Sequence, residues 1–128
     1  MDNTKATAKA LTEKVIEAKL EELNLTRNED GSISGELKRG LTIGPDTHKT
    51  FTVREGTAAD LFNAEKAATA EKAVSYRAAV LCQQLVKVGS FEGPFTLSLL
   101  GKLSSGDLNR LHTAQDMVDT LGEVAPRG

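Results

Sequence analysis

Side chains that could do chemistry are few in this sequence, and they lie far apart. The histidines are His48 and His112, and the single cysteine is Cys82. A zinc site needs several Cys or His ligands at close spacing, which one Cys and two distant His do not supply. A general base needs a partner within hydrogen-bond reach, and neither histidine stands in a motif that provides one. We therefore predict no metal site, no cofactor and no catalytic residue. His112 is interpreted as a surface or boundary side chain, and Cys82 as a small buried hydrophobe.

Two further patterns point away from enzyme chemistry. The Gly-containing stretch "GSFEGPF" lacks the Lys-Ser/Thr pair of a P-loop. Adjacent carboxylates, such as Glu21-Glu22 and Glu29-Asp30, fall on surface-like segments, where solvated charge is the simpler interpretation. The sequence predicts that the protein is not an enzyme.

Composition narrows the class of protein. The chain has 128 residues, of which 39% are hydrophobic and 27% charged, and 16 Lys+Arg stand against 18 Asp+Glu for a net charge of −2. No apolar run reaches the roughly 18 residues that a membrane span needs. The segment "MDNTKATAKALTEK" lacks the apolar region of a secretory signal, and a lone cysteine fits a reducing compartment. We expect a cytoplasmic protein with no membrane partner and no nucleic-acid partner.

A helix-turn-helix DNA reader is the alternative that the short helices raise. The last helical segment would offer Arg110 and His112 to DNA, beside Asp107, Asp116 and Asp119. Those acids would repel phosphate, so a regulatory role is the less favoured alternative.

The elements that position these residues follow from periodicity. Residues 4–23 are dense in good helix formers, and residues 32–55 alternate in the manner of a β-hairpin, with a loop at 44–48 and a weak spot at Gly35 or Gly40. Helical segments then follow at 57–68, at 70–88, in "TLSLLGKL" and in "SSGDLNRLHTAQDMVDTLGEV". The order predicts an α+β fold that is mainly helical, with an N-terminal helix, one antiparallel hairpin and three to four C-terminal helices. We expect a single domain over 1–128, composed of an N-terminal helix (1–24), the hairpin (32–55), a helical part (57–121) and a flexible tail (122–128).

Two apolar stripes are candidates for protein interaction. The first lies on the N-terminal helix and the second on the last helix; they comprise Leu11, Val15, Leu20 and Leu23, and Leu108, Leu111, Val118 and Leu121. Packing inward is the alternative for both stripes, and it is favoured for the second. The first stripe sits on a separate helix that can dock in trans as well as in cis, so we expect a homo-oligomer.

Helix starts are marked by two similar patterns, Thr57-Ala-Ala-Asp60 and Ser104-Ser-Gly-Asp107. A Thr or Ser hydroxyl can accept a free backbone N–H at a helix start, and an Asp three residues later favours the positive end of the helix dipole. These four residues are predicted to be structural caps. Arg54 and Glu55, just before the first pattern, are interpreted as an exposed charged pair at the end of a strand.

The two cap patterns also carry a family resemblance. The string "FTVREGTAADLFNAEKA", followed later by "LLGKLSSGDLNRLHTAQDMV", resembles the small tail assembly proteins of Mu-like and related contractile-tailed phages. That family has a strand ending in Leu-Arg-Glu-Pro-Thr-x-x-Asp-Leu and a later Leu-x-x-Leu-Ser-x-x-Asp-Leu-x-x-Leu element. This chain has Gly56 where the family commonly has Pro. The resemblance covers roughly residues 33 to 121 and leaves out the N-terminal helix.

The resemblance implies a function that the residues alone do not. Members of this family are described as tail assembly chaperones, which hold the tape measure protein soluble while the tail tube assembles around it. Further partners implied are the tail tube protein and a longer, frameshifted form of the chain itself. The implied location is the host cytoplasm, with the protein absent from the mature virion. The alternative of a different class is a small structural tail or baseplate protein that the virion retains.

Overall fold

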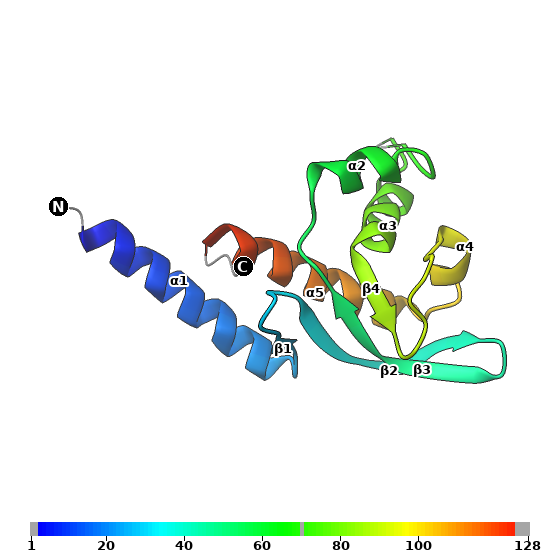
Figure 1. Ribbon diagram of the computed structural model, residues 1–128, viewed down its shortest axis with the longest axis horizontal. Coiled ribbons are helices and arrows are strands. Elements are labelled where there is room, and N and C mark those ends of the chain that lie inside the picture. Colours follow the sequence, from blue (N-terminus) through cyan, green and yellow to red (C-terminus); the bar gives the residue numbers. More distant parts are fainter. Residues whose placement is uncertain (1–2, 70, 125–128) are drawn as a thin grey trace.

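The fold is known from a computed structural model, which describes residues 3–69 and 71–124, with side chains described from residue 13 on. Helices and strands in this part of the chain follow in the order α1 (Asn3–Glu22), β1 (Thr26–Arg27), β2 (Ile33–Ile43), β3 (Asp46–Val53), α2 (Ala58–Ala64), α3 (Ala73–Gln84), β4 (Leu85–Val88), α4 (Leu97–Leu100) and α5 (Ser105–Val124). The α+β class and the succession of N-terminal helix, hairpin and C-terminal helices are confirmed (Figure 1).

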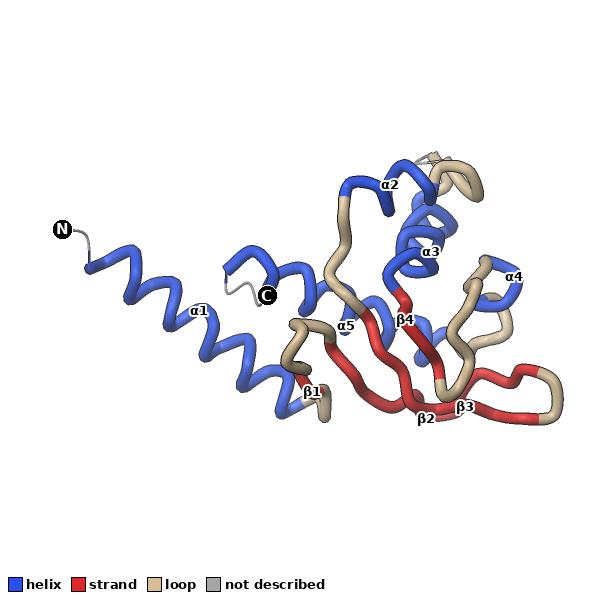
Figure 2. Tube along the Cα trace, viewed as in Figure 1, coloured by secondary structure: helices blue, strands red, loops and turns tan. Residues whose placement is uncertain are grey.

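The β2–β3 hairpin is the centre of an antiparallel sheet of four strands, in the order β1-β2-β3-β4 (Figure 2). Ile33 pairs with Val53 at one end of the hairpin, and Ile43 pairs with Asp46 at the turn. The loop is therefore shorter than predicted, because β3 already begins at Asp46. The pairing shifts between Glu36 and Leu41, where Gly40 has φ +93, a backbone conformation that glycine adopts without steric cost. The weak spot predicted at Gly35 or Gly40 is this bulge at Gly40.

The helix predicted over 70–88 is wrong at its end. Helix α3 stops at Gln84, and the next four residues form β4. Phe51, Thr52 and Val53 of β3 pair with Val88, Lys87 and Leu85. Leu85 and Val88 are buried with two exposed residues between them, a spacing that continues the helical stripe, so the pairing with β3 decided for a strand here.

Helix α5 packs against β2 and β3 and forms the main core with them (Figure 1). Ile33 and Phe51 from the sheet, and Leu111, Ala114 and Leu121 from α5, are almost completely buried. The helix continues to Val124, so the predicted tail is helical at its first three residues, and its remainder, residues 125–128, lies outside the described residues.

Helix α1 contacts the fold through its carboxyl-terminal half. It packs against α5 and β1, while its amino-terminal end lies well away from the sheet and the other helices (Figure 1). Leu20 is buried in the core, with Ile16 and Leu23 packed against it. None of the described helices is both long and apolar enough to cross a bilayer.

Two aspartate junctions and an acidic groove

The chain between β3 and α2 is held by Arg54 and Asp60. The Arg54 guanidinium donates to both carboxylate oxygens of Asp60 at 2.8 Å each, and it donates again to the Gln83 carbonyl at 2.7 Å. Asp60 is buried, and its carboxylate also accepts the Thr57 backbone N–H at 2.8 Å, as in a capping box. The hydrogen bonds from Arg54 hold the pKa of Asp60 below its ordinary value, against the opposing effect of burial. Arg54 is thus the partly exposed partner of the buried Asp60, so its interpretation as a pair with Glu55 is wrong.

A buried amide connects this junction to α5. Gln84, at the end of α3, is almost fully buried and donates to the Arg54 carbonyl at 3.0 Å and to Asp119 at 3.1 Å. Its oxygen accepts a bond of 2.8 Å from the Gln115 side chain. Asp119 also accepts the Gly56 backbone N–H at 2.8 Å, and burial raises the pKa of Asp119 in spite of these donors. The β3–α2 junction is therefore tied to both α3 and α5 through polar groups.

His112 belongs to the same network, so its interpretation as a surface or boundary residue is wrong. Its ring is buried, and its Nδ1 lies 2.9 Å from Oε1 of Gln115. Burial lowers the pKa of His112, although the bond to Gln115 acts in the opposite direction. Its helical neighbours Asn109, Gln115 and Asp116 are polar, so the sequence did not indicate this burial.

The second junction, at the start of α5, uses its aspartate differently. Ser104 caps the helix by accepting the Asp107 backbone N–H at 3.1 Å. The Asp107 carboxylate instead accepts three backbone N–H groups of the β2 bulge, from Lys38 at 2.8 Å and from Arg39 and Gly40 at 3.0 Å. Burial opposes ionisation of Asp107, but these donors, together with Ser104, outweigh it and lower the pKa of the carboxyl. A carboxylate that sequence analysis assigned to its own helix thus fastens that helix to the sheet.

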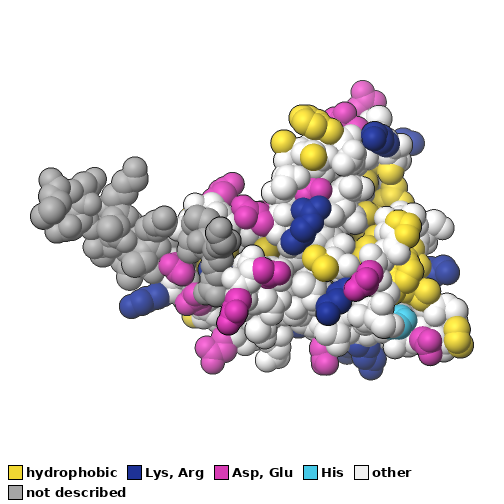
Figure 3. All heavy atoms as spheres, viewed as in Figure 1, with side chains coloured by type: hydrophobic (Ala, Val, Ile, Leu, Met, Phe, Trp, Pro, Cys, Tyr) yellow, Lys and Arg dark blue, Asp and Glu magenta, His cyan; other side chains and the backbone are white. Residues whose placement is uncertain are grey.

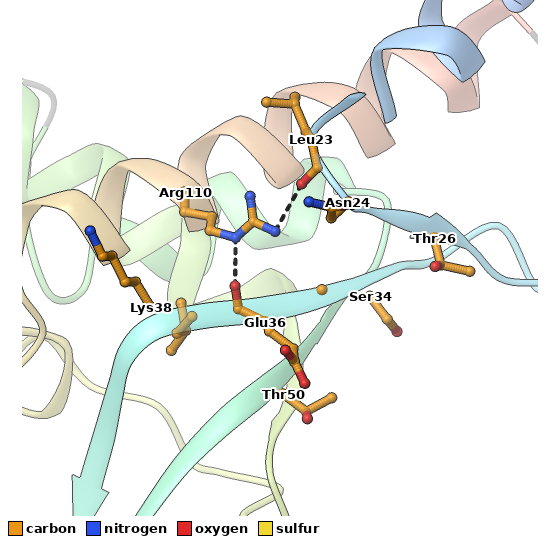
Figure 4. A pocket seen from close by; sticks show the side chains of 10 residues that line it. Leu23, Asn24, Thr26, Ser34, Glu36, Lys38, Thr50 and Arg110 are labelled. Carbon is orange, nitrogen blue, oxygen red and sulfur yellow. Dashed lines mark hydrogen bonds between the residues drawn. The ribbon is translucent and has the colours of Figure 1, made fainter. Parts of the chain in front are cut away.

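Arg110, one turn further along α5, binds the same edge of β2. Figure 4 shows its guanidinium reaching the carbonyl oxygens of Glu36 in β2 and Leu23 after α1. Strand β1 pairs with Ile33 and Ser34, so within the described residues β2 has no strand on that side from Gly35 onward. Asp107 accepts hydrogen bonds from N–H groups of this edge that have no strand partner, and Arg110 donates to a carbonyl of the same edge. Covering a strand edge in this way removes a template for unwanted strand pairing. Beside them lies an open cavity of about 730 Å³, lined mainly by residues of β2 and the α1–β1 connection.

The first predicted stripe is divided in the structure. Leu20 is buried and Leu23 is partly buried, both packed into the core of their own chain. Val15 is 68% exposed and lines a small cavity of about 380 Å³ with Met117 of α5. The side chain of Leu11 lies outside the described residues. The carboxyl-terminal half of α1 therefore packs in cis, and Val15 is the member of the stripe whose described side chain is open.

The second predicted stripe packs inward, which was the favoured alternative. Leu111, Val118 and Leu121 are each at most 1% exposed, and Leu108 packs against the same core while partly exposed. These side chains hold α5 to the sheet, and Leu108 is the member of the stripe that stays partly exposed.

Open apolar surface lies elsewhere, on α2 and the start of α3. Leu61, Phe62 and Val74 are 45%, 69% and 77% exposed. We call these three residues the apolar patch; Figure 3 shows hydrophobic side chains at the α2 end of the molecule. The helical spacing of α2 shows Leu61 and Phe62 as apolar positions but not which of them faces outward, so sequence reasoning did not find the patch.

Next to the apolar patch lies a groove of about 530 Å³, lined by residues of the β3–α2 junction, α2, α3 and α5. Its apolar wall comprises Ala58, Leu61, Tyr76 and Val80, and its rim carries the carboxylates Glu55, Asp116, Asp119 and Glu123. Among the described residues that line it, Arg77 is the one cation, and it pairs with Asp116 at 2.9 Å. We call this the acidic groove.

Groups suited to metal or nucleophile chemistry are not assembled in the described part of the chain. No cluster of three or more His, Cys, Asp or Glu that could hold a metal ion occurs there. Cys82 is buried, as predicted, and burial raises the pKa of its thiol to about 11, so the thiol stays protonated near neutral pH.

Fold and site together define a small α+β protein whose buried carboxylates fasten helices to a central hairpin beside an open groove. The chain belongs to the family described as "Tail assembly protein gp41", which matches residues 37–128. It is 34% identical over 101 residues to the "Probable tail assembly protein gp41" of Escherichia phage Mu, a match that covers 66% of this chain and 69% of that protein.

Two further relatives agree. The "Probable tail assembly protein FS-gp41" of Escherichia phage Mu is also 34% identical over 101 residues, and the match covers 53% of it, so this chain spans about half of that longer protein. The "Mu-like prophage FluMu protein gp41" of Haemophilus influenzae is 31% identical over 87 residues, covering 59% of this chain and 68% of that protein. No solved structure matched the chain. The predicted family is confirmed, and the family match includes Thr57, Asp60, Ser104 and Asp107 but not α1.

Proposed function

We propose that this protein acts as a tail assembly chaperone that binds the tape measure protein and keeps it soluble while the tail tube forms. The role is non-catalytic, takes place in the host cytoplasm, and ends before the virion is complete. Membership of a tail assembly family supports the general role. The observation that carries the finer proposal is the exposed apolar patch beside the acidic groove, on an otherwise charged chain.

The physical demands of a holdase suit this surface. A protein that keeps a long helical partner soluble needs apolar side chains in the open, because burial of apolar surface drives the association. It also needs charge around them, so that the free protein does not aggregate. Phe62 and Val74 meet the first demand, and the carboxylates of the acidic groove meet the second.

Co-expression with the tape measure protein of the same phage tests the proposal. We expect the tape measure to be soluble with this chain, to co-purify with it, and to precipitate without it. The variant F62E/V74E, which charges two exposed positions, should fold normally and lose most of this activity. Val86→Glu is the matched control, because Val86 is an exposed valine (41%) on β4, away from the patch. A tape measure equally soluble without the chain would overturn the proposal.

Mass spectrometry of purified virions separates the chaperone from a retained structural protein. A chaperone that leaves before completion is absent or present only in traces. Stoichiometric copies in the particle would refute the departure step and favour a small tail or baseplate component.

A further inference from the structure

We propose that the acidic groove receives the amino-terminal half of α1, residues 3–12, from a second copy of the chain. The contact runs head to tail, from the helix of one molecule to the groove of the next. It concerns self-association and does not depend on the tape measure proposal.

Charge complementarity is the first argument. By sequence, residues 3–12 contain Lys5 and Lys9 and no acid, whereas residues 13–22 contain four glutamates and two lysines. Helix α1 therefore combines a cationic half with an anionic half. The rim of the groove is anionic, because Glu55 and Glu123 are exposed there and the cation Arg77 is already paired with Asp116. Opposite charges on helix and groove favour association and set its orientation.

Shape is the second argument. The groove has an apolar wall from Leu61, Tyr76 and Val80, and it opens to solvent between helices. Helix-in-groove binding lays a helix against such an apolar wall. Ten residues of α-helix are about 15 Å long, and by sequence this stretch carries small residues at the i,i+4 positions Ala6 and Ala10.

Connectivity is the third argument, because it excludes the same molecule as the source of the helix. The carboxyl-terminal half of α1 is fixed to α5 through Ile16, Leu20 and Leu23. Since α1 is one continuous helix, its first half points away from its own body (Figure 1). A helix that leaves its own chain and a groove elsewhere on the same chain make a heterologous contact, which gives rings or open chains.

A charge-swap experiment tests the proposal on the full chain by sedimentation equilibrium. K5E/K9E makes the helix acidic, and E55K/E123K makes the groove rim basic. Each variant alone should self-associate at least about tenfold more weakly than the wild type, since every helix now meets a groove of like charge. An equimolar mixture should regain association, because both hetero contacts are then complementary. Raising NaCl to 0.5 M should weaken wild-type association, as screening predicts.

The controls separate this site from general charge effects. K49E/K102E and E29K/E92K change the same net charge at exposed positions away from the groove and should leave the mass unchanged. Circular dichroism confirms that each variant is folded. A wild type that stays monomeric at all concentrations, a K5E/K9E variant that associates like the wild type, or a mixture that fails to recover would each overturn the proposal. None of these measurements involves the tape measure protein, so its outcome stands apart from that of the chaperone test.

Discussion

Asp60 and Asp107 occupy the same position in two similar sequence patterns, yet they hold different parts of the molecule together. Each is the third residue of its helix, after a Thr or Ser at the cap, and each is followed by Leu. Asp60 bonds locally, to the Thr57 N–H and to Arg54 six residues before it. Asp107 bonds to backbone N–H groups 67 to 69 residues away in β2.

The difference lies in the hydrogen-bond donors that lie near each carboxylate. Strand β3 ends just before α2, so a cation from the strand can reach Asp60 within one short connection. Helix α5 begins against the β2 bulge, where three N–H groups converge and have no strand partner. The same cap pattern therefore organises one junction along the chain and the other across the fold. The following substitutions probe that contrast, from the largest expected effect to the smallest.

Asp107→Asn should be the most damaging change. Hydrogen bonds to a charged group are worth about 1.5–3 kcal/mol, and an amide presents only one acceptor to three donors. We expect a loss of about 2–3 kcal/mol in the free energy of unfolding, measured by urea denaturation. Amide exchange at Lys38, Arg39 and Gly40 should become faster. Asp46→Asn, at an exposed position, should stay within about 0.5 kcal/mol and serves as the control. Equal effects of the two variants would contradict the anchoring role of Asp107.

The stability of the fold should fall in acid because Asp60 and Asp107 become protonated. The folded-state pKa values of Asp60 and Asp107 are lowered, so the unfolded chain binds more protons between those values and the ordinary pKa of about 3.9. Stability is fully present above that ordinary pKa and is lost as pH falls through the folded pKa. Asp119, whose pKa is raised, contributes in the opposite direction. In urea titrations below pH 5, the difference between wild type and Asp107→Asn should shrink as pH falls; a constant difference would show that Asp107 is not preferentially ionised in the fold.

Asp60→Asn should cost less and act locally. Arg54 is 41% exposed at its side chain, so water can replace part of what the guanidinium loses. We expect about 1–2 kcal/mol, with faster amide exchange at the start of α2 and unchanged protection in β2. Arg54→Lys keeps the charge but not the paired geometry, so its free energy of unfolding should lie between those of the wild type and Asp60→Asn. Loss of protection at the β2 bulge in Asp60→Asn would show that the two junctions are coupled.

Ser104→Ala should have the smallest effect of the set. It removes the hydroxyl that accepts the Asp107 N–H, and caps of this kind contribute about 1 kcal/mol. Ser105→Ala, one residue later and exposed, is the matched control and should be nearly neutral. A Ser104→Ala effect as large as that of Asp107→Asn would mean that the cap, and not the contact with β2, dominates this junction.

Sequence patterns located most of the fold and one part of the site. Periodicity predicted α1, the hairpin and α5, and glycine within a strand pattern predicted a weak spot at Gly35 or Gly40, of which Gly40 is the bulge. The cap patterns placed Asp60 and Asp107 at helix starts and also identified the family. They did not predict the partners Arg54 and β2, the four-residue strand β4, or the burial of His112.

Those failures share a cause. Strand β4 continues the apolar spacing of α3, and only hydrogen bonds from β3 make its extended form the better one. Gln84 and Gln115 are polar residues that are nearly inaccessible to solvent, and a sequence offers no sign that each completes the other's hydrogen bonds. Burial of such groups becomes tolerable only after the elements have met.

The sequence by itself determined the class of fold, the helix starts after Thr57 and Ser104, the net charge, and membership of a tail assembly family. The elements and helix starts depend on neighbours within one or two turns of chain, where spacing and capping chemistry act directly. The net charge is a sum over residues and needs no fold. Only the tertiary structure decided that the stripe of α5 is core, that Asp107 fastens α5 to β2, and that Phe62 and Val74 stay open beside an acidic groove. Each of those outcomes depends on which distant surfaces come into contact, because burial and hydrogen-bond satisfaction are properties of the assembled fold.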